Sequence, residues 1–299
     1  MDIMGAVTYG ILWSVMALGV FMTYRVLNYS DLTVEGSYTT GGSVGAILIT
    51  MGVNPFLASL AAFGAGCAAG WGTSLLHNKL KIPGLLAGIL SMTALWSVNL
   101  HIMGKANIAL IREETVFTIF ERAFGLSKTY SVFVCGLLIV LIIVLLLWAF
   151  LNTEIGYALR ATGNNEVMIR SLGVNTEKTK AIGLILCNGL VALAGSLICQ
   201  YQKFADISMG TGVIVIGLAS VIIGEVLIGR RSVLANIIAV VVGAVIYRFI
   251  VALVLWLGLP PNDLKLFTAI IVALCLALPY IKDVVLTNIN NRKSEKEQC

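Results

Sequence analysis

Charged side chains are scarce in this chain. They make up 12% of its 299 residues, whereas hydrophobic residues make up 59%. A soluble domain of ordinary composition has about twice that share of charge and much less apolar material to bury. The composition therefore excludes a soluble globular protein and indicates a polytopic membrane protein. The net charge of +5 does not call for a nucleic-acid partner.

Clusters of reactive or metal-binding residues are also missing from the sequence. The six cysteines stand singly, without a C-x-x-C pair or a Cys/His spacing that would bind zinc. A membrane-embedded enzyme would need a nucleophile or a metal cluster, and the sequence offers neither. We therefore expect no catalytic residue, no metal site and no cofactor held by this chain.

Long apolar segments are what the sequence has in quantity. Residues 130–151 carry no charge and would rise roughly 33 Å as a helix, enough to cross a hydrocarbon core. Apolar windows predict nine such segments: 5–24, 32–53, 55–77, 83–104, 130–151, 180–201, 211–229, 233–257 and 264–281. We predict an all-α polytopic membrane protein with about 8–10 transmembrane helices. Gly, Ser, Thr and Asn interrupt the second, fourth and seventh segments, which are expected to be broken helices.

The basic residues predict the orientation. With alternating crossings, the larger basic group lies on one side and consists of Arg25, Lys79, Lys81, Arg160, Arg170, Lys178, Lys180, Arg230, Arg231, Lys282, Arg292, Lys293 and Lys296. The smaller group lies on the other side and consists of Lys105, Arg112, Arg122, Lys128, Lys203 and Lys265. The positive-inside rule places the larger group in the cytoplasm. The N-terminus is therefore predicted outside and the C-terminus in the cytoplasm.

Two short stretches resemble each other. DLTVEG at 31–36 and DISMG at 206–210 share the order acid, branched apolar, hydroxyl, apolar and glycine, and each precedes a Gly-rich segment. By the orientation above they start from opposite faces of the membrane, which is what an inverted-topology repeat would leave. The repeat units would span about 30–151 and 180–281. A chance match of so short a pattern is the alternative.

Polar side chains in the second and fourth segments are candidates for a solute pathway. Ionisable residues inside a membrane are costly and usually face the protein interior or a wet cavity. The candidates are Glu35, Ser37, Tyr38, Thr39, Thr40, Trp96 and Asn99. Close helix packing explains the glycines between 36 and 45 equally well, but it does not explain Glu35.

Two other charges fall inside predicted segments. We expect Glu225 to form a structural ion pair with Arg230 or Arg231. Arg248 could attract an anionic solute group or form a hydrogen bond between helices.

The polar segment 152–179 carries the signals of a short capped helix. Asn164 or Asn165 can cap its start with Glu166 in the first turn, and Gly173 suits the left-handed position just after its end. The predicted helix has about eight residues and is marginal alone in water. Its apolar contacts would be Val167, Met168 and Leu172, which would pack on its own membrane domain or on a partner.

This segment also resembles that of a known family. GYALRATGN at 156–164, followed by RSLGV at 170–174, is similar to the cytoplasmic coupling segment of ABC importer permeases of the branched-chain amino acid and ribose type. ASVIIG at 219–224 resembles a later glycine motif of that family, although Glu225 stands where a second glycine is expected. DLTVEG resembles a subgroup associated with aromatic amino acid (tryptophan/tyrosine) uptake.

The resemblance implies a permease subunit in a bacterial inner membrane that passes a small solute, in this case an amino acid. It implies a second permease copy, two cytoplasmic ATPase subunits that hold ATP and Mg, and an extracellular substrate-binding lipoprotein. The lack of a G-x-x-x-x-G-K-[ST] loop agrees with ATP being bound elsewhere. ATPase contact is expected at Arg160, Ala161, Thr162, Gly163, Asn164, Val167, Met168, Leu172 and Gly173.

The whole of 1–285 is expected to form one permease domain, followed by a cytoplasmic tail at 286–299. An ion-coupled secondary transporter with inverted repeats is the alternative. Such a transporter would usually carry carboxylates at mid-membrane, whereas the acids here lie near segment ends.

Overall fold

The computed structural model describes residues 3–125, 127–229 and 232–258, together with scattered positions between 266 and 277. Within this part, six helices are long and apolar enough to cross a membrane. They are α1 (Ile3–Phe21), which a π-helical turn η1 (Met22–Val26) extends, α3 (Pro55–Asn78), α4 (Gly84–Met103), α6 (Lys128–Leu151), α9 (Thr176–Gln202) and α11 (Val233–Trp256). Two further apolar helices are α2 (Thr33–Thr50) and α10 (Val213–Ile228).

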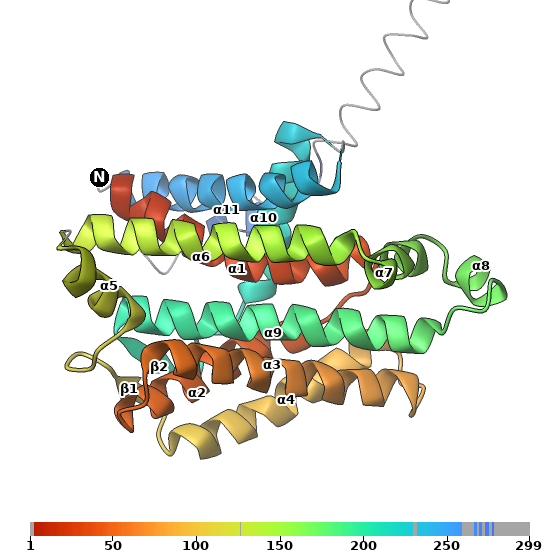
Figure 1. Ribbon diagram of the computed structural model, residues 1–299, viewed down its shortest axis with the longest axis horizontal. Helices are drawn as coiled ribbons and strands as arrows, with labels where there is room; N and C mark the ends of the chain where they lie inside the picture. Colours follow the sequence, from red (N-terminus) through yellow and green to blue (C-terminus); the bar gives the residue numbers. More distant parts are fainter. Residues whose placement is uncertain are drawn as a thin grey trace, which may run out of the picture.

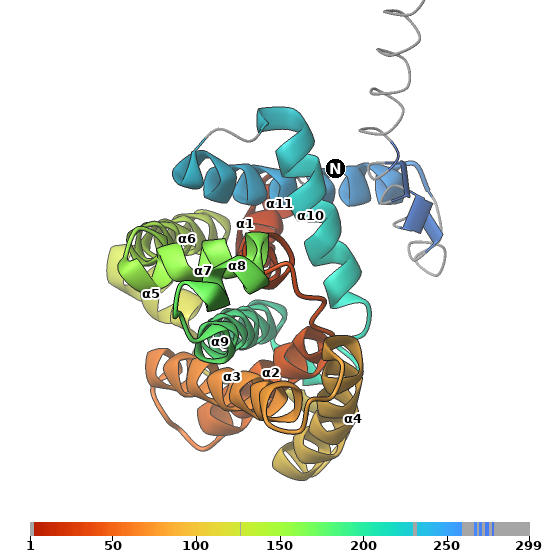
Figure 2. The ribbon, with the colours of Figure 1, turned by 90° about the vertical axis from the view of Figure 1, so that its right-hand side faces the viewer.

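The long helices form a bundle with two distinct ends (Figure 1). At one end lie the short helices α7 (Glu154–Asn164) and α8 (Glu166–Ser171). At the other end lie α5 (Val116–Phe124) and an antiparallel ribbon of β1 (Asn107–Ala109) and β2 (Phe204–Asp206). These are called the α8 end and the ribbon end below. Seen from the α8 end, α9 lies between α6 and α7 on one side and α2 and α3 on the other (Figure 2).

Helices α1 and α9 form the centre of the bundle. Both have long apolar stretches, and more of their surface is buried than that of the other spanning helices. Leu12, Val15 and Met16 of α1 and Leu184 and Val191 of α9 are completely buried. A helix that is apolar on all sides is expected at the core of a bundle, and that is where these two lie.

Glycines bring α2 close to α9. A Cβ added at Gly41 would collide with the backbone of Ala192, and one added at Gly195 would collide with the carbonyl of Tyr38. Gly45 faces the side chain of Ser196 in the same way. Small residues let helix backbones approach within a membrane bundle, so these glycines serve helix packing.

Eight of the nine predicted segments correspond to helices of the structure. The expected interruptions of the second and fourth are wrong, because α2 and α4 are continuous α-helices. The hydroxyls that suggested a break donate back to the helix itself, as Thr40 does to Gly36 O (2.9 Å) and Ser43 to Thr39 O (2.8 Å). The seventh segment forms the short helix α10, and non-helical backbone at 207–212 precedes this helix. The segment 264–281 (scattered positions aside) and the tail 286–299 lie outside the described residues.

The two similar stretches form the same local turn. Asp31 Oδ1 accepts a hydrogen bond from Thr33 N (2.9 Å), and Asp206 Oδ1 accepts one from Ser208 N (2.8 Å). Asp206 lies in the ribbon, whereas Asp31 precedes α2, whose chain arrives from the α8 end through η1. The turn that the sequence similarity suggested is therefore present at both places, while the extent of the repeat units stays a prediction.

Candidate functional site

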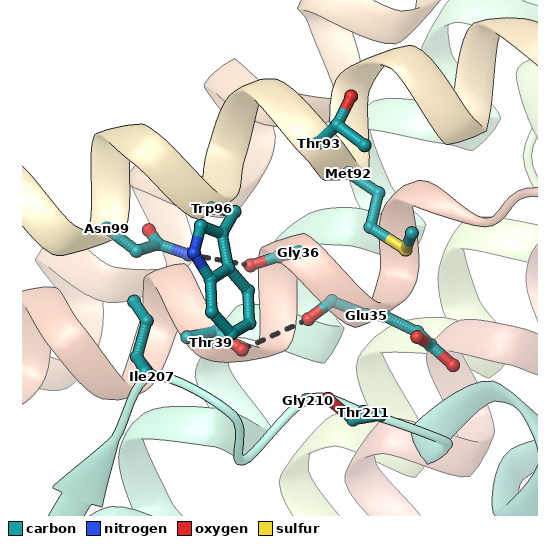
Figure 3. A pocket seen from close by; sticks show the side chains of 10 residues that line it. All are labelled: Glu35, Gly36, Thr39, Met92, Thr93, Trp96, Asn99, Ile207, Gly210 and Thr211. Atoms are coloured by element: carbon teal, nitrogen blue, oxygen red, sulfur yellow. Dashed lines mark hydrogen bonds between the residues drawn. The ribbon is translucent and has the colours of Figure 1, made fainter. Parts of the chain in front are cut away.

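A cavity of about 360 Å³ lies between α2, α4 and the 207–212 segment that leads into α10 (Figure 3). Its lining consists of Glu35, Gly36, Thr39, Met92, Thr93, Trp96, Asn99, Ile207, Gly210 and Thr211. Glu35 and Thr39 come from one face of α2, because residues four apart lie above one another on a helix. Thr93, Trp96 and Asn99 share a face of α4 by the same spacing. The cavity thus brings together four of the seven predicted pathway residues.

Glu35 lies where two helices begin. It is in the first turn of α2, and its Oε1 accepts a hydrogen bond from Gly212 N (2.9 Å) at the N-cap of α10. Helix N-termini carry partial positive charge and favour a carboxylate. Gly210 permits this arrangement, since a Cβ there would collide with the backbone carbonyl of Glu35. The position of the acid is therefore determined by both α2 and α10.

Asn99 and Trp96 form the opposite wall. Asn99 is 1% exposed, and its Nδ2 donates to Gly36 O at 3.3 Å. Its Oδ1 is buried and has no hydrogen-bond partner among the described residues. Figure 3 shows the indole of Trp96 beside Asn99 and Thr39. The cavity therefore offers a carboxylate next to one aromatic face, and the amide oxygen of Asn99 is buried in its wall.

The other three predicted pathway residues point elsewhere. Ser37 donates to Asn188 Oδ1 (2.6 Å) on α9, and Thr40 bonds to its own helix. Tyr38 is buried against Trp13, with ring centroids 5.6 Å apart. These side chains lie on the packed faces of α2. The sequence identifies the hydroxyls of this segment, but it does not show which face of the helix the cavity occupies.

Five lining residues were missed by sequence reasoning. They are Met92, Thr93, Ile207, Gly210 and Thr211, besides the backbone of Gly36. A signal for two of them was present, because Met92 and Thr93 precede Trp96 at helical spacing on α4. The resemblance between 31–36 and 206–210 indicated the stretch that contains Ile207 and Gly210. It did not predict that the two stretches lie in contact.

The remaining two membrane charges are paired in ways the sequence did not specify. Glu225 forms an ion pair with Arg25 of η1, with 2.5 Å between Oε1 and Nε. Its expected partners, residues 230 and 231, lie outside the described residues. Arg248 of α11 stacks on two rings of α1: its Cζ is 4.4 Å from the centroid of Tyr9 and 3.9 Å from that of Trp13. A cation over aromatic faces thus joins α11 to α1.

The short helix predicted in 152–179 is present as α8. Asn165 is its N-cap, with Oδ1 accepting from Met168 N at 3.0 Å, and Gly173 has the left-handed φ of 85° just beyond its end. The helix has six residues, fewer than the eight expected, because the chain turns at Leu172. The capping prediction is confirmed, and Asn165, not Asn164, is the cap.

The apolar side chains of α8 divide between the two sides of the helix. Val167 is 77% exposed and Leu172 is 70% exposed, and Met168 is also exposed. Ile169, which the sequence reading did not single out, is 6% exposed and is the residue that packs inward. Three apolar side chains on one small exposed element form a surface that we call the α8 patch, defined by Val167, Met168 and Leu172.

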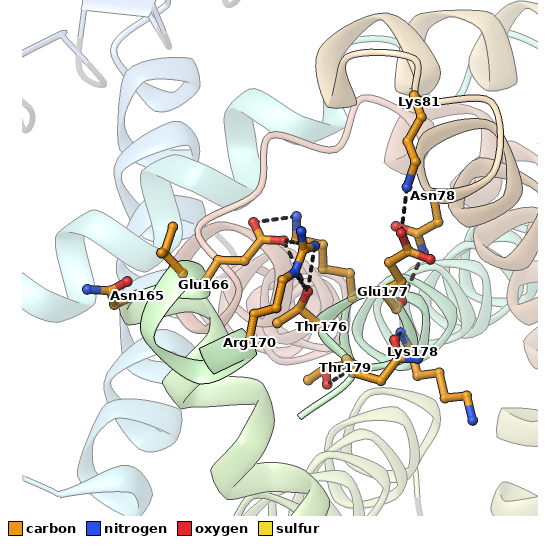
Figure 4. Close-up of polar contacts among 12 residues, drawn as sticks. Asn78, Lys81, Asn165, Glu166, Arg170, Thr176, Glu177, Lys178 and Thr179 are labelled. Carbon is orange, nitrogen blue, oxygen red and sulfur yellow. Dashed lines mark hydrogen bonds and ion pairs between the residues drawn. The ribbon is translucent and has the colours of Figure 1, made fainter. Parts of the chain in front are cut away.

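Charged contacts hold α8 against the start of α9 (Figure 4). Glu166 accepts from Lys180 Nζ (2.7 Å), Arg170 Nη2 (3.2 Å) and Thr176 Oγ1 (3.2 Å). The hydrogen bond from Lys180 is the main cause that lowers the pKa of Glu166 below its ordinary value. These contacts fix the direction in which the α8 patch points.

The other predicted coupling residues, except Gly173, belong to α7 and do not share the exposed α8 patch. Thr162 is buried and donates to Ala158 O at 2.7 Å. Gly163 lies against the carbonyl of Val26, where a Cβ would collide. Arg160 has its Cζ 4.6 Å from the ring centroid of Tyr157. Of these contacts, that of Gly163 joins α7 to η1, and the other two lie within α7. Of the rest of the predicted set, Asn164 and Gly173 are exposed, and Ala161 is half-buried.

A helical bundle with six membrane-length apolar helices in the described part of the chain defines a multi-pass membrane protein. Residues 3–278 match the family described as branched-chain amino acid transport system, permease component, and the chain belongs to that family. It is therefore a permease subunit of an ATP-binding cassette importer in the inner membrane. It is a transport subunit.

The curated relatives include permeases for different solutes. The chain is 42% identical over 275 residues to the tyrosine transport system permease protein of Clostridioides difficile (strain R20291), covering 92% of this chain and 90% of that one. It is 28% identical to the ribose import permease protein RbsC of Escherichia coli (strain K12), covering 79% and 72%. It is 27% identical to the probable branched-chain amino acid permease LivH of Methanocaldococcus jannaschii, covering 74% and 72%. No solved structure matches the chain.

Proposed function

We propose that this permease subunit imports an amino acid with an aromatic or other apolar side chain, and that the cavity at Glu35 lies on its path. The observation that carries the proposal is the pairing of a carboxylate with one indole face in a single cavity, whose wall also holds the buried, unpartnered amide oxygen of Asn99. The relative that is 42% identical over most of its length is named for tyrosine transport, which supports the same class of solute.

The chemistry of the cavity suits an ammonium group attached to an apolar body. A carboxylate forms charge-assisted hydrogen bonds with an ammonium donor. The buried Oδ1 of Asn99 needs a donor, because buried acceptors are rarely left without one. The ring of Trp96 can pack against an aromatic side chain or attract the cation through its face. A polyanion or a sugar would leave the carboxylate without a matching charge.

The assembly belongs to the same proposal. Two copies of this chain would form the membrane pathway, two ATPase subunits would hold ATP and Mg on the cytoplasmic side, and an extracellular binding lipoprotein would deliver the solute. The α8 patch would be the surface that receives the ATPase. A capped helix with three exposed apolar residues supports this role, because exposed apolar clusters mark interaction sites. In this arrangement the N-terminus lies outside and α8 inside.

Uptake into proteoliposomes tests the proposed solute path. The permease would be reconstituted with its ATPase and binding protein, and ATP-driven uptake of labelled tyrosine would be measured. Glu35→Gln keeps the shape of the side chain but removes its charge, so uptake is expected to fall roughly tenfold, equivalent to about 1.4 kcal/mol. Glu114→Gln changes an exposed acid outside the cavity and should transport normally.

Two results would contradict the proposal. Normal uptake by a correctly assembled Glu35→Gln variant would remove the cavity from the path. Uptake that continues without the ATPase but stops when an ion gradient is dissipated would instead indicate a secondary transporter.

A further inference from the structure

A second cavity, of about 420 Å³, lies at the α8 end between η1, α7 and the start of α11. In contrast to the Glu35 cavity, its polar lining is rich in donors. Arg25 and Arg160 face it, together with three asparagines, Asn28, Asn164 and Asn236. Neither the proposed solute path nor the α8 patch includes this cavity.

The two arginines have hydrogen-bonding capacity left over. Arg25 uses its Nε to pair with Glu225, while its Nη2 is buried without a hydrogen-bond partner among the described residues. Arg160 Nε is likewise buried and unpartnered. No carboxylate of the described part lies within ion-pair distance of Arg160, whose guanidinium stacks on Tyr157 instead. Buried N–H groups of charged side chains are costly to leave unsatisfied.

We propose that this cavity binds a phosphate-bearing anion, and that the anion is the headgroup of an acidic phospholipid. Among the described residues, two guanidinium groups line the cavity and one carboxylate, Glu225, pairs with Arg25, which leaves an excess of positive charge. The planar fork of a guanidinium matches the oxygens of a phosphate in two parallel hydrogen bonds. The structure thus places two guanidinium groups, each with one unsatisfied nitrogen, beside one cavity.

The depth and rim of the cavity favour a lipid over a free phosphate. The apolar helix α1 ends in η1 beside the cavity, and Phe21, Leu151 and Val233 line it as well. A headgroup site needs both features: cations at the level where the helices leave the hydrocarbon, and apolar surface for the glycerol and acyl region. The Oδ1 of Asn236 is buried without a partner among the described residues and can accept from a headgroup hydroxyl. Phosphatidylglycerol offers both the phosphate and the hydroxyl.

Native mass spectrometry of the purified full-length permease tests the site. The protein would be released from nanodiscs that contain equal amounts of phosphatidylglycerol and phosphatidylcholine, and the retained lipids would be counted. Wild type is expected to retain phosphatidylglycerol at least about fivefold in excess, a difference of about 1 kcal/mol. Arg160→Gln should abolish the preference. Lys178→Gln removes one exposed charge at the same end and should keep it.

Arg25→Lys is a second variant, and it tests the site without removing a charge that folding requires. It keeps the positive charge beside Glu225 but removes the fork, so retention of phosphatidylglycerol should decrease while thermal unfolding is unchanged. Glycerol phosphate, titrated into protein in phosphatidylcholine nanodiscs, separates the two sources of phosphate. Binding of glycerol phosphate without selective lipid retention would support a phosphate site for a free ligand and overturn its assignment to a lipid.

Equal lipid retention by wild type and both arginine variants, with no binding of glycerol phosphate, would overturn the whole inference. So would variants that lose the ATPase during purification while retaining lipid as wild type does, because the arginines would then serve a protein partner. Tyrosine uptake is not among these readouts. The outcome is therefore distinct from that of the Glu35 test.

Discussion

At the scale of single residues, the structure explains why an acid and several glycines occur in an apolar segment. Glu35 sits at the N-termini of α2 and α10, where its charge is favoured and where it links the two helices through Gly212. Gly41 and Gly45 of α2 lie against α9 and permit close contact between the helices, whereas Gly36 lies against α4. The acid and the glycines therefore have separate physical reasons, although they are neighbours in the sequence.

Glycine at position 195 is predicted to be required for packing. In Gly195→Ala the added Cβ would meet the carbonyl of Tyr38, so the helices must separate, at a cost of roughly 1–3 kcal/mol. Gly64→Ala is the matched control, since nothing lies within 4 Å of the Cβ that it would add. Thermal unfolding in detergent should show a lower midpoint for Gly195→Ala only. An equal midpoint for both variants would contradict the packing argument.

At the scale of elements, α8 is the clearest case of a local sequence signal that specifies structure. Its cap, its first-turn acid and its terminal glycine were all readable, because capping depends on residues within one turn. The burial of Ile169 could not be predicted from the sequence. The choice of Ile169 over its apolar neighbours depends on the position of the rest of the bundle.

The α8 patch is predicted to bind the ATPase. Leu172→Asp places a charge on an exposed position, so the permease itself should fold normally while copurification of the ATPase falls at least about tenfold. Leu172→Met keeps the apolar surface and should copurify as wild type does. Affinity purification of the tagged permease measures both. An unchanged yield of ATPase with Leu172→Asp would exclude the patch from the interface.

The helix interruptions show where element-level prediction failed. Glycine and hydroxyl residues in the second and fourth segments suggested breaks, but within a bundle the hydroxyls bond to carbonyls one turn earlier and the glycines lie against neighbouring helices. Both effects depend on what surrounds the helix. Apolar length, in contrast, is a property of the segment itself, and it predicted the spanning helices that the structure describes.

At the scale of the whole molecule, the bundle connects its two ends through α9. This helix begins beside α8, where Lys180 holds Glu166, and passes through the centre to the ribbon, from which the chain enters the Glu35 cavity and α10. A movement of α8 would therefore act on an element that leads directly to the cavity. Sequence similarity between 31–36 and 206–210 indicated both stretches that line this region. Only the folded structure shows that they are in contact.

The most direct test of a solute path at the Glu35 cavity is the reactivity of Thr93→Cys in the assembled transporter. Thr93 lines the cavity, whereas Thr50→Cys, exposed at the end of α2, is the control. Labelling with a small maleimide would be timed with and without ATP and with and without tyrosine. We predict that the labelling rate of Thr93→Cys changes with ATP and falls when tyrosine is present, while that of Thr50→Cys does not respond to tyrosine. A rate for Thr93→Cys that is the same in all four conditions would contradict the account.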